Sequence, residues 1–527
     1  MAIWRRVSIV VACVLGVIAA LPAIAAEHSI AWVVQGKPTP LAKSAVKILE
    51  QAGDEGLNPS DYDAGGLSKD IAAASQGAGL STTKQSELNT GITQSMQRYL
   101  RDLHYGRVDP RTVYAKFDVP PKNLDLDATL NKAVVANDLN LAVKEAEPSF
   151  PLYKALRPWL ATYRALEGNP AWSGNLPPLP AQKLEPGAAY VGVNLLAARL
   201  VSLGDLPAGF VAPERYQGTL VDGVKHFQKR HGLSPDGVIG KSTFEQLNVK
   251  PAARVEQIAL TMERLRWTPL MVDKRLLVVN LPEFELRGIE INGDQVQIPL
   301  KMNVIVGKSL NTQTPMFNEQ MRAIEFSPYW NVPPSITRAE TVPKLRRDPG
   351  YFDRQGFEIV TRSGEVVTHV DEAQLAALQS GQSRIRQRPG AQNALGDIKF
   401  IFPNNDNIYM HHTPSVGLFQ RDRRDFSHGC IRVEAPVELA EFVLKDEPEW
   451  TPEKIREAME NGTSKTIRIK TPIMVVIAYA TAIVKQRGGT IYFYTDIYGH
   501  DRQLRAALQK YSQRFQVQVP NSSGNSL

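Results

Sequence analysis

The chain has 527 residues, of which 43% are hydrophobic and 22% are charged, and its net charge is +7 at pH 7. This length is too great for one hydrophobic core, so we expect two to four domains, and the composition is that of a globular protein. The positive excess is spread thinly, which argues against specific nucleic-acid binding and mildly favours an anionic partner surface.

The first 25 residues have the features of a secretory signal. Arg5 and Arg6 precede an apolar run from Val7 to Leu21, which is shorter than the roughly 20 residues that a membrane-spanning helix needs. Ala23-Ile24-Ala25 then supplies the small residues of a cleavage site. We therefore predict a signal peptide over residues 1–25. The alternatives are an uncleaved segment that retains the chain at the membrane, a twin-arginine signal and a lipoprotein signal at Cys13.

The exported chain would contain a single cysteine. Of the two in the sequence, Cys13 would leave with the signal and Cys430 would remain. One thiol cannot form an internal disulfide, so Cys430 is either buried and inert, paired with another molecule, or reactive.

Residues 26–180 are rich in Ala and Leu at helical spacing, as in Leu152, Leu156 and Leu160. This pattern predicts a mostly helical domain, and it holds no cluster of catalytic residue types. Within it, Gly106–Pro110 predicts a turn that ends a helix. The stretch from Gly168 to Gly187 contains five prolines and predicts a linker.

Residues 188–249 have the pattern of a three-helix unit. One helical face carries Leu196, Leu200 and Leu203, and a capping box of Ser242 and Glu245 is predicted to open the third helix. The segments Val221–Gln228 and Asp236–Gly240 resemble the peptidoglycan-binding module of many cell-wall enzymes. We expect His226 and His231 to be surface residues of a helix in this module.

From about residue 270 to 500 the sequence predicts a β-rich domain with a few helices. Asn292-Gly293 predicts a hairpin. Strands are expected at Leu276–Leu281, Val304–Val306, Asp397–Phe402, Ile408–His411, Ile467–Ile469, Ile473–Ala480 and Thr490–Tyr494. The aromatic loop Phe326–Pro334 is expected to be a packing loop, with a substrate-facing wall as the alternative. Residues 501–527 are expected to form a C-terminal helix and tail.

The residue types that carry chemistry gather around Cys430. Tyr409–Pro414 includes two histidines, and fifteen residues separate His411 from Ser427-His428-Gly429-Cys430. A cysteine is nucleophilic as its thiolate, so it needs a nearby base, and histidine is the usual base near neutral pH. Gly429 lets the backbone bend closely around a substrate. This segment predicts a cysteine hydrolase or acyltransferase.

The same spacing resembles the signature of the L,D-transpeptidase (YkuD-like) catalytic domain. The resemblance extends to the large class of these enzymes, which carry a helical scaffold and a peptidoglycan-binding module, and it covers essentially the whole mature chain. Further matching stretches are Glu263–Trp267, Val279–Pro282, Thr314-Pro315, Pro328–Pro333, Gln387–Gly390, Asn393–Gly396 and Asp496–Gly499. The general signature often has Asn two places after the cysteine, whereas this chain has Arg432, as the large class commonly does.

The resemblance implies an α+β multidomain fold: a helical scaffold domain, a three-helix peptidoglycan-binding module and a β-rich catalytic domain. It implies that Cys430 attacks the third residue of a tetrapeptide stem and releases the terminal D-alanine. A side-chain amine of a neighbouring stem, of the diaminopimelate type, then takes the acyl group and forms a 3→3 cross-link. The resemblance also implies acylation of Cys430 by carbapenems and no metal or organic cofactor. The predicted signal peptide implies a periplasmic location.

The resemblance assigns the base to His411, oriented by a backbone carbonyl near His412, and an oxyanion hole to backbone N–H groups around Gly429 and Cys430. Ser427, His428, Gly429, His412 and Arg432 are supporting residues. Tyr409, Trp330 and Tyr329 are candidates for substrate binding. From the residues alone, either His411 or His428 could be the base, because His428 is only two residues from Cys430.

Three other functions share these features. Water as the acceptor would give an L,D-carboxypeptidase, and a chain without chemistry would be a peptidoglycan-binding protein. Attachment of a lipoprotein to the wall is the third. The expected partners are stem peptides of peptidoglycan and proteins of cell-wall synthesis, and no nucleic acid.

Overall fold

The computed structural model describes residues 30–77, 79–114, 117, 122–268, 274–293, 295–309, 312–485 and 489–516. The predicted signal peptide lies outside these residues. No helix in the described ranges combines the length and the apolar character needed to cross a membrane.

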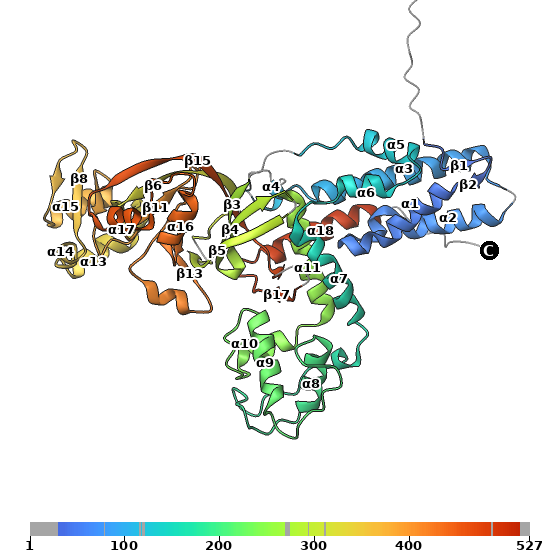
Figure 1. Ribbon diagram of the computed structural model, residues 1–527, viewed down its shortest axis with the longest axis horizontal. Helices are drawn as coiled ribbons and strands as arrows, with labels where there is room; N and C mark the ends of the chain where they lie inside the picture. Colours follow the sequence, from blue (N-terminus) through green and yellow to red (C-terminus); the bar gives the residue numbers. More distant parts are fainter. Residues whose placement is uncertain are drawn as a thin grey trace, which may run out of the picture.

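The N-terminal part is a helical bundle that begins with a two-stranded ribbon (Figure 1). Its elements are β1 (Val33–Val34), β2 (Lys37–Pro38), α1 (Pro40–Glu50), η1 (Gln51–Glu55), η2 (Pro59–Tyr62), α2 (Ala64–Gln76), α3 (Thr82–Tyr105), α4 (Pro110–Val113), α5 (Leu126–Val135), α6 (Asn140–Ala146) and α7 (Pro151–Ala165). The N-cap side chains of Thr39 and Ser81 accept hydrogen bonds from the first turns of α1 and α3.

The turn predicted at Gly106 ends α3, and a close contact requires glycine there. Gly106 has a φ of 84°, and a Cβ on it would lie 2.5 Å from Nε1 of Trp267 in α11 (Pro251–Trp267). A larger residue would therefore strain the backbone and push the bundle away from α11.

Distant parts of the chain complete the core of this bundle. Ile258 and Met262 of α11, and Ala482, Ile491 and Phe493 of the hairpin β16 (Ala482–Val484)–β17 (Ile491–Phe493), are buried in it. The last helix, α18 (His500–Gln516), also packs here, since the Tyr511 hydroxyl donates to the buried Asp102 carboxylate at 2.5 Å. The hairpin and α18 follow the β-rich part in the sequence but pack on the helical bundle. The domain limits given above therefore stay predictions.

The three-helix module has its own core and lies below the junction of bundle and sheet in Figure 1. Its elements are η3 (Pro170–Trp172), α8 (Val193–Ser202), α9 (Thr219–Arg230) and α10 (Lys241–Leu247). The proline-rich stretch predicted as a linker contributes to this core through Leu176 and Leu184, both buried.

Two predictions about this module are wrong. Gly240 is the N-cap of α10 and no side chain caps it, so Ser242 lies inside the helix and no capping box forms. His231 is buried, because its ring stacks on Phe227 at 3.8 Å and also faces Phe493 of β17 at 5.7 Å. The side chain of His226 remains half-exposed and pairs with Asp205.

The β-rich part is built on a nine-stranded sheet in the order β13-β5-β14-β12-β11-β6-β15-β3-β4, and β4 also pairs with β5. These strands and their accompanying helices are β3 (Arg275–Asn280), η4 (Leu281–Glu283), β4 (Glu285–Asn292), β5 (Gln295–Gly307), β6 (Phe317–Phe326), β11 (Ile398–Ile401), β12 (Met410–His411), η6 (Val416–Gln420), β13 (Asp425–Ser427), β14 (Ile431–Val433), α16 (Pro436–Val443), α17 (Pro452–Glu460) and β15 (Lys465–Ala478). The two strands predicted between Ile467 and Ala480 are the single strand β15, with a register shift between Arg468 and Ile473. The helical bundle, the module and this sheet together confirm the predicted α+β class.

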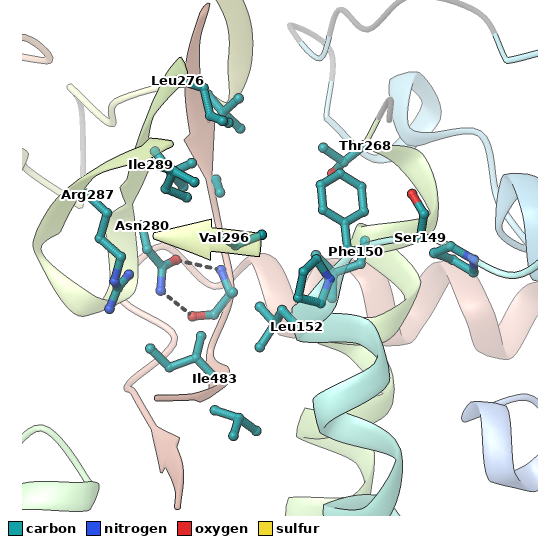
Figure 2. A pocket seen from close by; sticks show the side chains of 18 of the residues that line it. Ser149, Phe150, Leu152, Thr268, Leu276, Asn280, Arg287, Ile289, Val296 and Ile483 are labelled. Carbon is teal, nitrogen blue, oxygen red and sulfur yellow. Dashed lines mark hydrogen bonds between the residues drawn. The ribbon is translucent and has the colours of Figure 1, made fainter. Parts of the chain in front are cut away.

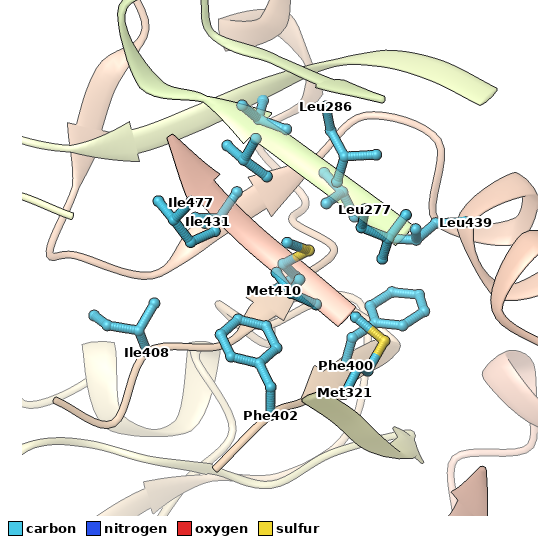
Figure 3. Packing of buried hydrophobic residues seen from close by; sticks show 14 of the residues in the cluster. Leu277, Leu286, Met321, Phe400, Phe402, Ile408, Met410, Ile431, Leu439 and Ile477 are labelled. Carbon is cyan, nitrogen blue, oxygen red and sulfur yellow. The ribbon is translucent and has the colours of Figure 1, made fainter. Parts of the chain in front are cut away.

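One face of this sheet encloses a hydrophobic core. Figure 3 shows Met410 of β12 and Ile431 of β14 among the core side chains of neighbouring strands, including Leu277 and Phe400. All four are fully buried, and each such side chain contributes about 1.5–3 kcal/mol. Because Met410 and Ile431 point into this core, the residues next to them in β12 and β14 point to the opposite face of the sheet.

The aromatic loop Phe326–Pro334 leads into a small subdomain inserted between β6 and β11. Its elements are β7 (Trp330–Asn331), α12 (Pro334–Ile336), η5 (Thr337–Thr341), α13 (Val342–Arg347), α14 (Tyr351–Arg354), β8 (Phe357–Thr361), β9 (Val366–Val367), α15 (Glu372–Ser380) and β10 (Ser383–Gln387). Its four strands form a separate sheet in the order β7-β10-β8-β9 with a core of its own, at the far left of Figure 1. At the root of the insert, the Asn393 amide donates to the carbonyls of Pro328 and Arg388.

Candidate active site

Two short parallel strands bring the predicted catalytic residues together. In the register of β12 and β14, Met410 pairs with Ile431 and His411 pairs with Arg432. Side chains alternate along a strand, so His411 and Arg432 lie on the face opposite Met410 and Ile431. Tyr409 and Cys430 precede these pairs, and the Ile431 N–H donates to the Tyr409 carbonyl at 3.0 Å. Tyr409, His411, Cys430 and Arg432 therefore form one patch on this face.

A row of charged side chains crosses the sheet through His411. Lys399 of β11 pairs with His411 on one side and with Glu325 of β6 on the other. On the far side of His411, Arg432 pairs with Ile305 of β5. The row thus places a cationic residue on each side of the imidazole.

His411 is buried with its ring fixed. Its Nδ1 lies 2.5 Å from the His412 carbonyl oxygen, and because a carbonyl only accepts, Nδ1 carries the proton. Burial, together with the nearby Arg432 charge, lowers the pKa of His411 from 6.5 to about 3. The imidazole is therefore neutral at neutral pH, and its Nε2 is the nitrogen left to accept a proton.

The Cys430 thiol is half-buried and in its protonated form. Burial raises its pKa, and contacts with Tyr409 together with the charges of Lys399 and Arg432 offset only part of that effect. Its Sγ lies 3.7 Å from the Asn407 carbonyl, while no hydrogen bond joins it to His411 among the described residues. A nucleophile here needs a base at the moment of attack, since no stable thiolate is formed beforehand.

The loop before Cys430 is a tight turn held by its own hydroxyl. The Ser427 Oγ donates to the Cys430 carbonyl at 2.5 Å and accepts from the Gly429 N–H at 3.1 Å. Gly429 has a φ of 116°, a conformation that only glycine adopts readily. The Gly429 N–H is thus already hydrogen-bonded, whereas the Cys430 N–H has no acceptor in the described part of the chain. The Cys430 N–H is therefore the donor available to an oxyanion.

Residues that sequence analysis did not single out anchor this loop from outside. The Thr314 hydroxyl donates to the Gly429 carbonyl at 2.7 Å and accepts from the Gly307 N–H at 2.9 Å. The Tyr498 hydroxyl donates to the Gly307 carbonyl at 2.7 Å, and the Thr312 hydroxyl donates to the Ser427 carbonyl at 3.2 Å. Thr314 and Tyr498 did fall in the stretches that carried the family resemblance, but nothing in the sequence indicated this role.

The other two histidines each pair with a carboxylate. His428 Nε2 lies 2.7 Å from Glu340 of the inserted subdomain, and His412 Nδ1 lies 2.8 Å from Asp397. The positive φ of Gly429 breaks the extended strand on which His428 and Cys430 would have shared a face. Of the two candidate bases, His411 is the one on the face of Cys430.

Tyr329 and Trp330 belong to the root of the inserted subdomain. The Arg386 guanidinium lies 4.3 Å from the centre of the Tyr329 ring, and Trp330 pairs with Gln387 and packs against the core of the insert. Neither makes a hydrogen bond or ring contact with Tyr409, His411 or Cys430 among the described residues.

A cavity of about 1250 Å³ lies elsewhere, between the helical bundle and the outer face of β3, β4 and β15. Figure 2 shows Phe150 and Leu152 across it from Val296 and Ile483. It does not include the Cys430 patch. Within the described ranges, no group of three or more His, Cys, Asp or Glu side chains has the arrangement of a metal site.

Three family models match the chain. A scaffold domain matches residues 25–160, a "Putative peptidoglycan binding domain" matches residues 191–247, and an L,D-transpeptidase catalytic domain matches residues 274–475. The last range includes both His411 and Cys430.

Among curated proteins, the chain is similar to a "Putative L,D-transpeptidase" of Haemophilus influenzae, with 32% identity over 252 residues. The match covers 48% of this chain and 49% of that protein, so the chain spans about half the length of the curated relative it matches.

Parts of the chain also resemble solved structures at low identity. An L,D-transpeptidase from Xylanimonas cellulosilytica has 16% identity, covering 57% of this chain and 100% of its own, with a TM-score of 0.16. A fused Zn-dependent amidase/peptidase/peptidoglycan-binding protein from Clostridium acetobutylicum has 11% identity, covering 56% and 99%, with a TM-score of 0.16. Superpositions this poor carry no argument about the chain. The family models do, and by them the chain carries an L,D-transpeptidase catalytic domain joined to a scaffold domain and a peptidoglycan-binding domain.

Proposed function

We propose that the protein is an exported L,D-transpeptidase that forms 3→3 cross-links in peptidoglycan through a Cys430 acyl-enzyme. The observation that carries this proposal is the shared face of His411 and Cys430 on adjacent parallel strands, with the imidazole neutral and its Nδ1–H bound by a carbonyl. The match of residues 274–475 to the L,D-transpeptidase catalytic domain supports the reaction class.

In the first half-reaction, the Nε2 of His411 takes the thiol proton as Sγ of Cys430 attacks the carbonyl carbon between the third and fourth stem residues. The Cys430 N–H is the donor available to the resulting oxyanion, and loss of such a donor typically costs about 2.7–4 kcal/mol. Collapse breaks the peptide bond, and His411 returns the proton to the leaving amine of D-alanine. A thioester between Cys430 and the stem remains.

In the second half-reaction, a side-chain amine of a neighbouring stem attacks the thioester carbonyl. His411 accepts a proton from this amine and passes it to the departing sulfur, which restores the thiol. One new amide bond replaces the thioester, and the enzyme returns to its starting state. Ser427, Gly429 and Thr314 hold the loop in place for both steps.

The remaining parts fit a wall substrate. We infer that the three-helix module holds the glycan or stem polymer near the catalytic sheet, and that the location is periplasmic. His428, His412 and Arg432 support the site, Tyr409 contacts the thiol, and Tyr329 and Trp330 stay candidates for substrate contact.

Incubation of the purified protein with a disaccharide-tetrapeptide, followed by mass spectrometry of the products, tests the proposal. A cross-linked dimer with free D-alanine is the expected result. A tripeptide product without dimer would identify an L,D-carboxypeptidase. Unchanged substrate together with binding to purified sacculi would leave a peptidoglycan-binding protein without this chemistry.

A further inference from the structure

The side chain of Arg432 has no hydrogen-bond or ion-pair partner among the described residues. It is half-buried beside Cys430, makes no hydrogen bond or ion pair with any described residue, and its Nε is a buried donor without an acceptor. Burial of an unpaired charge is costly, so proteins normally pair buried cations.

Each of the other buried arginines among the described residues has an acceptor for its guanidinium, although Nε of Arg264 and of Arg266 also has no hydrogen-bond partner. Arg230 pairs with Asp205 at 2.5 Å, and Arg266 pairs with Glu263 at 2.9 Å. Arg199 donates to three backbone carbonyls, those of Ala171, Gly174 and Leu247. Arg432 therefore departs from the pattern of its own protein, and it does so at the candidate active site.

The neighbours of Arg432 supply no carboxylate. Its register partners are the neutral His411 and the fully buried, apolar Ile305. The other cation of the row, Lys399, already has Glu325 at 3.4 Å. One guanidinium is left facing the same side as the nucleophile, with its hydrogen-bonding capacity unused. A planar guanidinium fork is suited to bidentate binding of a carboxylate.

We propose that Arg432 binds the terminal carboxylate of the donor stem, on the leaving side of the bond that Cys430 cleaves. This inference rests on the function proposed above. Arg432 follows Cys430 by two positions, so their Cα atoms are about 6.6 Å apart on one face. The terminal carboxyl carbon lies within about 4 Å of the scissile carbonyl carbon. A long arginine side chain reaches that position, whereas the other stem carboxylates lie further along the peptide.

Such binding would also place the leaving amine beside His411, the register partner of Arg432. The amine lies between the scissile carbonyl and the bound carboxylate, where the imidazole can return the proton taken from the thiol. Arg432 would thus select donors that end in a free carboxylate and align the leaving group.

The test compares two donor stems that differ only at the end, one with terminal D-alanine and one with D-alaninamide. The rate of release of the leaving group gives kcat/KM for acylation. We expect the wild type to prefer the acid by about 10- to 100-fold, the usual size for a charge-assisted hydrogen bond. Arg432→Gln should lose this preference, so that both donors react at similar rates. Arg432→Lys should keep part of it, since the charge remains and the fork is lost.

Two controls separate the explanations. Arg502→Gln removes an exposed arginine of α18 and should leave the preference unchanged. Alkylation of Cys430 by iodoacetamide reports thiol reactivity without any carboxylate. An Arg432→Gln variant that keeps the wild-type preference would overturn the proposal, as would an equal loss for both donors with slower alkylation, which would mean that Arg432 acts on the thiol. A wild type that releases neither leaving group would instead overturn the proposed function on which the inference rests.

Discussion

His411 and His428 differ in what each ring faces. His411 shares a face with Cys430 and is held by the His412 carbonyl, whereas His428 is bound to Glu340 of the insert. The two rings are therefore not interchangeable, although both are close to the cysteine in sequence.

We expect His411→Gln to reduce acylation of Cys430 by about 10²–10⁴-fold, the usual effect of losing a general base. His428→Gln should cost clearly less, because it removes a contact between the loop and the insert. Stopped-flow acylation by a carbapenem, with circular dichroism to check folding, measures both. The assigned roles would have to be exchanged if His428→Gln were the inactive variant.

The pH dependence of acylation follows from the two pKa shifts. His411 acts in its neutral form, and its pKa is lowered from 6.5 to about 3, so acylation should persist well below pH 6.5. The pKa of Cys430 is raised, so a rate increase from spontaneous thiolate should come only at alkaline pH. A pH–rate profile of kcat/KM checks this expectation. A loss of activity centred near pH 6.5 would show that the base is not buried as His411 is.

At this scale the sequence predicted the chemistry but not all of the geometry. The spacing of His411 and Cys430 is local information, and it predicted a cysteine nucleophile with a histidine base; the choice of His411 over His428 came from the family resemblance and stays a prediction. The row formed with Lys399 and Arg432 depends on the register of strands that are distant in the chain, which no local pattern encodes. His231 was predicted on the surface, because its burial against Phe493 is a contact across 262 residues.

Among the elements, the loop from Asp425 to Cys430 depends on residues of β5 and of the segment that follows it. Thr314 is central, because its hydroxyl serves both the Gly429 carbonyl and the Gly307 N–H. Gly307 itself cannot be replaced, since a Cβ there would lie 1.9 Å from the Thr312 carbonyl oxygen.

Thr314→Val keeps the shape of the side chain but leaves these two buried backbone groups without a partner. We expect a loss of about 1–3 kcal/mol in the free energy of unfolding for each such group. The activation free energy of acylation should rise by more than this loss of stability. Urea unfolding and the acylation rate measure the two effects. Thr312→Val is the matched control, since it removes one hydrogen bond of a less buried hydroxyl. Equal effects of the two variants would contradict the anchoring role of Thr314.

The inserted subdomain was missed from the sequence for a physical reason. Its strands β7 and β9 have two residues each, too short for any alternation to be seen. The aromatic loop at its entrance was expected to be a packing loop or a substrate-facing wall, and in the structure the Arg386 guanidinium lies over the ring of Tyr329 in this loop.

For the whole molecule, the parts are joined by buried contacts and not by loose connections. The module meets the hairpin through Arg230, which donates to the Ile491 carbonyl, and through His231, which faces Phe493. The hairpin in turn lies in the core of the helical bundle. The predicted class and the three kinds of unit follow from helical and strand periodicity. The packing of the hairpin and the last helix on the N-terminal bundle depends on long-range contacts, which periodicity does not specify.

His231 makes this junction sensitive to pH. Burial lowers its pKa well below 6.5, so the unfolded chain takes up a proton first as the pH falls, and the folded state loses stability below pH 6.5. For one such group the loss between pH 7 and pH 5 is about 2 kcal/mol. His231→Phe should therefore be relatively less destabilised at pH 5 than at pH 7. Denaturant unfolding of both proteins at the two pH values measures this, and a constant difference would show that His231 is protonated in the fold.

The central claim is that Cys430 forms an acyl-enzyme with a peptidoglycan stem, and intact-protein mass spectrometry tests it most directly. After brief incubation with a tetrapeptide donor in the absence of acceptor, the wild type should gain the mass of the donor less the mass of D-alanine. Hydrolysis of the thioester should be slow enough for this adduct to be detected. Cys430→Ala should fold normally and gain no mass. The same adduct on Cys430→Ala, or free D-alanine produced by that variant at the wild-type rate, would contradict the account.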